Sequence, residues 1–226
     1  MSVAAQRGDM TTAPDGLVRR IEPVARSYFG GDASPAHDWS HVERVRTNAE
    51  TLAAASPAAD RTVVRLAALL HDIGRGKERA GEIDDHAEWG AEESETRLIE
   101  HGASVETAEA VAHCVRTHRY STGPDPRTIE AELVSDADDL DALGAVGLAR
   151  CFAHGGVVGS PIHDPSGAPE AGDATAGGTQ LDHVRGKLFD IPGRLHTEAG
   201  RELADGRASY VRQFVRQFEA EVAGSR

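Results

Sequence analysis

The sequence contains little cysteine and no long apolar run. Cys114 and Cys151 are its only two cysteines, and they form no Cys-x-x-Cys pair. This scarcity argues against a disulfide framework and against a structural zinc site built from thiolates. No apolar run approaches the roughly 18 residues that a membrane span needs, and residues 1–15 lack the apolar stretch of a signal peptide. We therefore expect a cytoplasmic protein with no membrane partner.

Lysine is also scarce, and acidic residues are in excess. Lys77 and Lys187 are the only lysines among 24 basic residues, and 37 acidic residues give a net charge of -13. This composition favours a halophilic protein, because in molar salt the Debye length falls to about 3 Å and carboxylate repulsion is screened. A GC-rich genome also replaces lysine by arginine, but it does not explain the net charge. We expect no binding to nucleic-acid polymers, so an anionic substrate needs a local positive centre.

The spacing of apolar residues predicts an all-α fold. Apolar residues recur every three or four positions, and alternating β-branched runs are scarce. At 226 residues the chain is long enough for one sizeable core in a single domain. Residues 61–72 are apolar on almost every face and are expected to form a buried central helix. The remaining predicted helices span 15–29, 35–56 (capped by Ser34), 84–100, 104–119, 126–152 (with a break near Ser135), 180–189 and 197–222.

Residues 155–178 have a different composition. They are dense in Gly, Pro, Ala and Asp and have no hydrophobic period. A connection of this length without secondary structure is either disordered or functional. Two roles stay open, namely a lid that closes over substrate and excludes water, and a solvated insertion that the fold tolerates at little cost.

Three clusters of histidine and carboxylate carry the candidate chemistry. His71 and Asp72 end the buried helix, where an unpaired charge is strongly unfavourable and a metal ion would neutralise it; a polar pair that faces solvent is the alternative. His37 and His41 are four residues apart and are expected to share one helical face. Residues 135–141 hold four carboxylates among apolar positions. Their mutual repulsion would raise their pKa values unless a cation is present.

The ordered set His41, His71, Asp72 and Asp138 resembles the signature of the HD superfamily of metal-dependent phosphohydrolases. It is most similar to a bacterial and archaeal subgroup with a His-Ala-x-x-Gly-Ala element, here residues 86–91. That subgroup also has an Asp-Ala-Asp-x-Leu-Asp-Ala-x-Gly-Ala run, here residues 136–145. The resemblance extends over roughly residues 17–220. It implies one helical bundle with a central metal site, an HD core at about 36–153 and C-terminal helices at 180–222 that pack on it.

The resemblance also assigns the ligands of one divalent metal ion. They are His41, His71, Asp72 and Asp138, and Asp72 is in addition the expected catalytic residue. Manganese is the preferred ion, and Fe, Co, Ni, Mg and Zn also suit imidazole and carboxylate ligands. The ion would polarise a phosphoryl group and lower the pKa of bound water toward neutrality. The two-metal branch has paired histidines where this chain has His118 and Arg119, which argues against a second metal.

A nucleotide is the expected substrate, because relatives in this subgroup act on nucleoside triphosphates. Phosphate groups would be bound by five polar side chains, for each of which a purely solvent-facing role is the alternative. These five are Arg75, Lys77, His86, His118 and Arg119. His37 and Asp38 either orient His41 or simply begin its helix.

Other functions stay open at this point. A cyclic or linear phosphodiesterase, an iron-dependent oxygenase and a non-catalytic, metal-stabilised regulatory module are the alternatives to a nucleoside triphosphate pyrophosphohydrolase or nucleotidase. The sequence also leaves a homodimer open.

Overall fold

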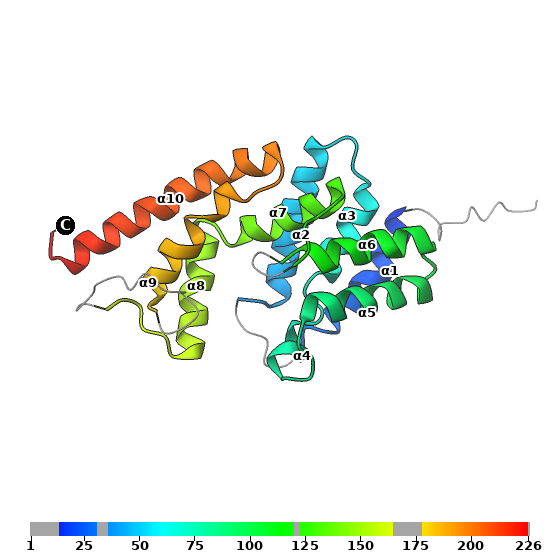
Figure 1. The fold of residues 1–226 in the computed structure, drawn as a ribbon, viewed down its shortest axis with the longest axis horizontal. Helices are drawn as coiled ribbons and strands as arrows, with labels where there is room; N and C mark the ends of the chain where they lie inside the picture. Colours follow the sequence, from blue (N-terminus) through cyan, green and yellow to red (C-terminus); the bar gives the residue numbers. More distant parts are fainter. Residues whose placement is uncertain (1–13, 31–35, 120–122, 165–177, 226) are drawn as a thin grey trace, which may run out of the picture.

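The computed structural model describes residues 14–30, 36–119, 123–164 and 178–225, and within these ranges the regular structure is helical, without strands (Figure 1). None of the described helices is long and apolar enough to cross a membrane. The elements are α1 (Pro14–Arg26), α2 (Trp39–Ala55), α3 (Arg61–Leu70), α4 (Arg75–Arg79), α5 (His86–Glu100), α6 (Val105–Thr117), α7 (Ile129–Asp141), α8 (Gly144–Val158), α9 (Gln180–His183), η1 (Val184–Leu188), η2 (Ile191–Gly193) and α10 (Glu198–Val222).

Helix α3 lies at the centre of the fold, as its sequence predicts. The side chain of Asp60 caps it by accepting hydrogen bonds from the backbone N–H groups of Thr62 and Val63. Helices α1, α2, α6 and α7 pack around it, and every residue from 66 to 70 has no exposed surface. Burying one leucine side chain contributes about 1.5–3 kcal/mol. This packing fixes the position of the turn that follows α3, where His71 and Asp72 lie.

The C-terminal elements form a second group beside this core. Helix α10 packs on α8 and α7 (Figure 1). Asp136 of α7 is fully buried and accepts hydrogen bonds from the backbone N–H groups of His196 (2.8 Å) and Thr197 (2.9 Å) and from the Thr197 hydroxyl (2.6 Å). A side chain at Gly200 would collide with this carboxylate. Asp136 therefore joins the start of α10 to the core.

Two boundaries in the N-terminal half differ from the sequence prediction. Helix α2 begins at Trp39, because Asp38 is its N-cap and accepts a hydrogen bond from the backbone N–H of His41 (2.9 Å). His37 therefore precedes the helix and does not share its face with His41; Ser34 lies outside the described residues. Past α3, Arg75 and Lys77 are not in a loop but in the short helix α4.

The C-terminal half differs from the sequence prediction at three points. The break in the predicted 126–152 helix falls at residues 142–143, not near Ser135, because Leu143 is extended and Gly144 has a φ of 71°. Helix α8 continues to Val158, so residues 155–158 of the predicted loop are helical, and residues 165–177 lie outside the described chain. On α10, the apolar spacing of residues 197–222 predicts one buried stripe that includes Leu203 and Tyr210, but both side chains are exposed.

Candidate metal centre

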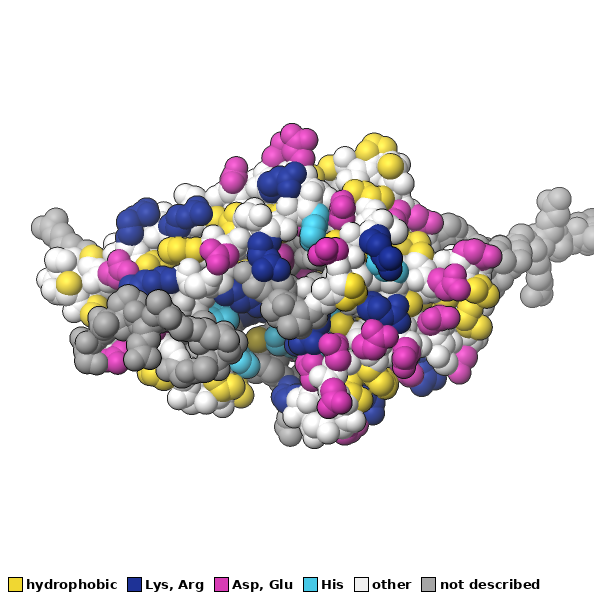
Figure 2. Space-filling model, in the orientation of Figure 1, with side chains coloured by type: hydrophobic (Ala, Val, Ile, Leu, Met, Phe, Trp, Pro, Cys, Tyr) yellow, Lys and Arg dark blue, Asp and Glu magenta, His cyan; other side chains and the backbone are white. Residues whose placement is uncertain are grey.

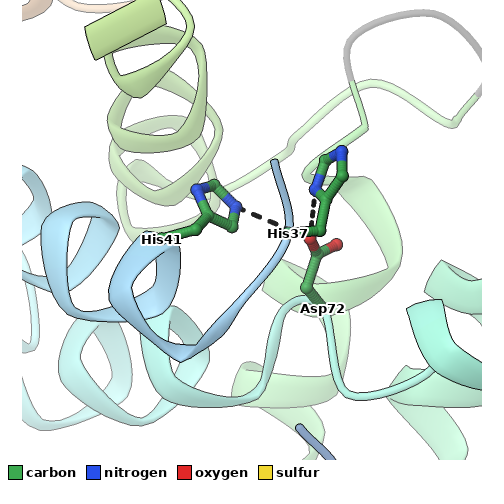
Figure 3. A group of neighbouring side chains, drawn as sticks. All are labelled: His37, His41 and Asp72. Carbon is green, nitrogen blue, oxygen red and sulfur yellow. Dashed lines mark hydrogen bonds and ion pairs between the residues drawn. The ribbon is translucent and has the colours of Figure 1, made fainter. Parts of the chain in front are cut away.

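Asp72 lies in the turn after α3, and one of its carboxylate oxygens faces three histidines. The distances from its Oδ2 are 3.1 Å to His37 Nδ1, 3.5 Å to His41 Nε2 and 3.8 Å to His71 Nε2. Figure 3 shows His41, on α2, and His37, on the segment before it, on either side of this carboxylate. The buried end of α3 thus brings residues 37–41 and 71–72 together.

The other oxygen of Asp72 faces a second pair of histidines. Its Oδ1 is 3.3 Å from His86 Nε2 and 3.4 Å from His118 Nε2, and both imidazoles are buried. Gly74 permits this approach, because a Cβ at that position would lie 2.6 Å from the carbonyl oxygen of His86. The sequence predicted phosphate contacts for His86 and His118, and the structure places both imidazoles against the predicted metal-binding carboxylate.

Each of four buried histidines donates its Nδ1–H to an acceptor. Because carbonyl and carboxylate oxygens only accept, this bond orients the ring and leaves Nε2 as the donor atom for a metal whenever the imidazole is neutral. The pairs are His41 with Asp141 Oδ2 (2.8 Å), His71 with the carbonyl of Ala68 (2.9 Å), His86 with Glu78 Oε2 (3.0 Å) and His118 with the carbonyl of Val115 (2.6 Å).

The Nε2 atoms of these histidines lie close together in pairs. Those of His41 and His71 are 3.2 Å apart, and those of His86 and His118 are 3.4 Å apart. In the neutral form both Nε2 atoms of a pair carry lone pairs, which a cation between them would stabilise, and neutral imidazole is a common metal ligand. The donor atoms of His41, His71 and Asp138, and those of Asp72, His86 and His118, each converge within 4.8 Å. The donor set therefore fits a divalent metal ion.

The protonation states of His71, Asp72 and Asp138 also suit metal binding. Burial lowers the pKa of His71 to about 4, so this imidazole is neutral at pH 7. Burial alone would raise the pKa of Asp138, but the neighbouring His41 and His71 lower it to about 2. Burial alone would also raise the pKa of Asp72. The positive charge of Arg75 and the surrounding imidazoles outweigh this effect and hold the pKa of Asp72 well below its usual range. Both carboxylates are ionised at neutral pH, as metal ligands must be.

The other predicted phosphate contacts already have acidic partners. Arg75 Nε lies 3.0 Å from Asp72 Oδ1, and Arg119 Nη1 lies 2.9 Å from Asp85 Oδ2. Lys77 is paired with Glu82 at 2.9 Å. Arg75 thus contacts the centre itself, whereas Lys77 and Arg119 pair with carboxylates around it.

Asp141 is a functional candidate that the sequence analysis did not single out. It accepts the Nδ1–H of His41 and also binds Arg44 (2.7 Å and 3.0 Å) and Arg150 (2.6 Å). Burial would raise its pKa, but the hydrogen bonds from His41 and Arg44 hold it well below its usual range. Its spacing in the sequence could have identified it, since Asp138 and Asp141 are three residues apart and share a face of α7.

A cavity of about 690 Å³ adjoins this centre at His37. Helix α8 contributes Arg150, Cys151 and His154 to its lining, and α9 and η1 contribute three further polar side chains, Gln180, His183 and Lys187. Figure 2 shows histidine and basic side chains together in the hollow near the middle of the molecule. The five predicted phosphate contacts do not line this cavity in the described chain. Arg150 and His154 lie on α8, and no sequence motif around them predicted a place in the site.

Comparisons with known proteins agree with this geometry. A family model, the HD domain, matches residues 38–143. The protein YpgQ of Bacillus subtilis is 33% identical over 197 residues, which cover 85% of this chain and 88% of YpgQ.

Solved structures have the same fold over nearly their whole length. A protein from Lactobacillus plantarum superposes with a TM-score of 0.75 at 28% identity, covering 92% of this chain and 97% of that one. Bacillus subtilis YpgQ in complex with ADP gives 0.72 at 29% identity, with coverages of 94% and 98%. An HD-superfamily hydrolase from Bacillus thuringiensis gives 0.72 at 31%, with coverages of 92% and 98%.

Proposed function

The chain belongs to the HD family of metal-dependent phosphohydrolases, and we propose that its substrate is a nucleoside triphosphate, cleaved at the α-phosphate to release pyrophosphate. The observation that carries this proposal is that the histidine–carboxylate centre adjoins, at His37, a cavity of about 690 Å³. That volume lies within the range of about 300–1,000 Å³ typical of small-molecule sites.

The four residues proposed to hold the ion are His41, His71, Asp72 and Asp138. Their donor atoms, with the imidazoles aligned by hydrogen bonds at Nδ1, fit a divalent cation. When bound there, such an ion supplies Lewis acidity at a phosphoryl oxygen and lowers the pKa of a coordinated water. Asp72, which the chain places between two pairs of imidazoles, would orient that centre from both of its oxygens.

The protein's own cations would position the anionic substrate. Arg150 and Lys187 line the cavity next to the centre, and a triphosphate needs positive charge in a chain whose net charge is -13. Bacillus subtilis YpgQ, which shares this fold and 33% of its sequence, binds ADP. That complex supports a nucleotide as the ligand of this chain.

A product analysis tests the proposal. We would incubate the Mn²⁺-loaded protein with nucleoside mono-, di- and triphosphates, cyclic dinucleotides and an aryl phosphate, and separate phosphate from pyrophosphate by ion chromatography. Carrying out the reaction in H₂¹⁸O locates the bond that is cleaved. We expect pyrophosphate and a nucleoside monophosphate that carries the ¹⁸O label.

Two results would contradict it. Release of inorganic phosphate from triphosphates would indicate attack at the γ-phosphate and a nucleotidase. Faster hydrolysis of a cyclic dinucleotide than of any triphosphate would favour the phosphodiesterase alternative. Asp72→Ala is the inactive control for both assays, because it removes the carboxylate shared by the two histidine pairs.

A further inference from the structure

Lys187 occupies a distinctive position in the C-terminal half of the chain. It belongs to η1, a π-helical segment that follows α9 directly. A π-helical turn alters the direction of the side chains relative to an α-helix, and such turns are frequent at functional sites. Within this segment Lys187 lines the large cavity, and His183, four residues earlier, lines it too. By contrast, Arg185 turns outward and pairs with Asp182 and Glu219.

Lys187 lines the same cavity that adjoins the metal centre. His37 also lines this cavity, and its Nδ1 lies 3.1 Å from Oδ2 of Asp72. Burial lowers the pKa of Lys187, and the carboxylates of Asp138 and Asp139 on α7 oppose that effect.

Two arginines near the centre are bound to protein groups. Arg150 donates from Nε to the carbonyl of Ala36 (2.9 Å) and from Nη1 to Asp141 (2.6 Å). Arg75 donates from Nε to Asp72 (3.0 Å). A lysine ammonium is a compact charge on a flexible stem, so Lys187 is able to turn from neighbouring carboxylates to a phosphate.

We propose that Lys187 binds the phosphate chain of the substrate within the cavity that adjoins the predicted metal ligands. This assignment rests on the proposed function, and it names a residue of the C-terminal helices as the determinant of affinity for a polyphosphate. Because the group acts on the ligand and not on the ion, its loss is expected to weaken nucleotide binding and leave metal binding unchanged.

Calorimetric titration of the whole Mn²⁺-loaded protein with ADP tests the proposal. Lys187→Met removes the charge and keeps an unbranched apolar side chain, Lys187→Arg keeps the charge, and Arg185→Met removes a cation from the same segment that points to solvent. Removing one charged hydrogen bond corresponds to about a 10- to 100-fold rise in Kd. We expect this rise for Lys187→Met, a smaller one for Lys187→Arg, and wild-type affinity for Arg185→Met. A Mn²⁺ titration of each variant is the second readout.

The outcomes separate this proposal from the proposed function. Wild-type ADP affinity in Lys187→Met overturns the role of Lys187, and so does an equal loss of Mn²⁺ affinity, which would make Lys187 a positioning residue for Asp138. If the wild-type protein binds no ADP, the nucleotide assignment fails, and the same titrations with inorganic tripolyphosphate decide on Lys187. A Kd for tripolyphosphate that rises only in the Lys187 variants supports a phosphate contact; absence of binding overturns both proposals.

Discussion

Residues 1–143 carry 27 acidic and 15 basic side chains, whereas residues 144–226 carry 10 and 9. Almost the whole net charge of the protein therefore belongs to the part that contains the histidine–carboxylate centre. The nearly neutral C-terminal part contributes Arg150 and Lys187 to the cavity. The two regions differ in chemistry as well as in sequence: one concentrates histidine and carboxylate donors, and the other contributes cations to the cavity. The cavity is lined by residues of both regions, with His37 from the first and Arg150 and Lys187 from the second.

The largest expected effect concerns the centre itself. Asp72→Ala removes the carboxylate that lies between two pairs of imidazoles, and we expect loss of bound metal and a fall in turnover of at least about 1,000-fold, which corresponds to about 4 kcal/mol of transition-state stabilisation. Metal analysis by mass spectrometry and a steady-state assay measure both. Asp84→Ala, an exposed carboxylate of the same region, is the control. Full activity in a metal-free Asp72→Ala protein would end the metal hypothesis.

The sequence predicted the N-terminal region well for physical reasons. Helix α3 is apolar on nearly every face, so its burial follows from composition, and the paired polar residues at its end require a partner. The order of His41, His71, Asp72 and Asp138 carried the family resemblance. The bridging position of Asp72 was not predictable, because it depends on how closely α5 approaches the turn at Gly74.

The C-terminal region was predicted less well. The cavity is lined by Arg150 from α8 and by His183 and Lys187 from α9 and η1, and no local spacing relates Arg150 to the other two. The end of α8 at Gly159, which has a φ of 72°, depends on a backbone conformation that composition does not specify. Tertiary contacts, and not periodicity, therefore determine which side chains line the cavity.

Asp136→Ala tests whether the two regions are held together by one buried carboxylate. Its loss leaves three hydrogen-bond donors at the start of α10 without their acceptor, and we expect a cost of about 3 kcal/mol in the free energy of unfolding. Hydrogen exchange of the α10 amides should accelerate more than that of α3. Asp182→Ala, which also removes a carboxylate bonded to a threonine hydroxyl but at a partly exposed site, should cost only about 1 kcal/mol. An equal loss in the free energy of unfolding for both variants would show that the burial of Asp136 adds nothing to stability.

Asp141→Asn tests a group that both regions contact, since His41 and Arg44 bind it from one side and Arg150 from the other. The amide no longer carries the negative charge that orients and polarises the His41 ring, and we expect metal affinity to fall by about 10- to 100-fold. Asp139→Asn is the matched control on the same helix. Burial and the adjacent Asp138 raise the pKa of Asp139 to about 8, so its side chain is already largely neutral at pH 7. A metal titration in which Asp141→Asn and Asp139→Asn both keep wild-type affinity would contradict the role of Asp141 in metal binding.

The smallest expected effect concerns the charge difference between the regions. Raising KCl from about 0.1 to 1 M shortens the Debye length from about 10 to 3 Å and screens carboxylate repulsion, so we expect the Tm to rise by about 2–4 °C for each kcal/mol gained.

Because the acidic excess lies in residues 1–143, Glu92→Gln with Glu109→Gln, both exposed there, should raise the Tm at low salt and reduce its salt dependence. The matched pair on α10, Glu202→Gln with Asp205→Asn, should change neither, since that region is nearly neutral. Calorimetry of the three proteins across the salt series measures all of this. A Tm that stays flat or falls with KCl would remove the halophilic interpretation and leave genomic base composition as the reason for the scarcity of lysine.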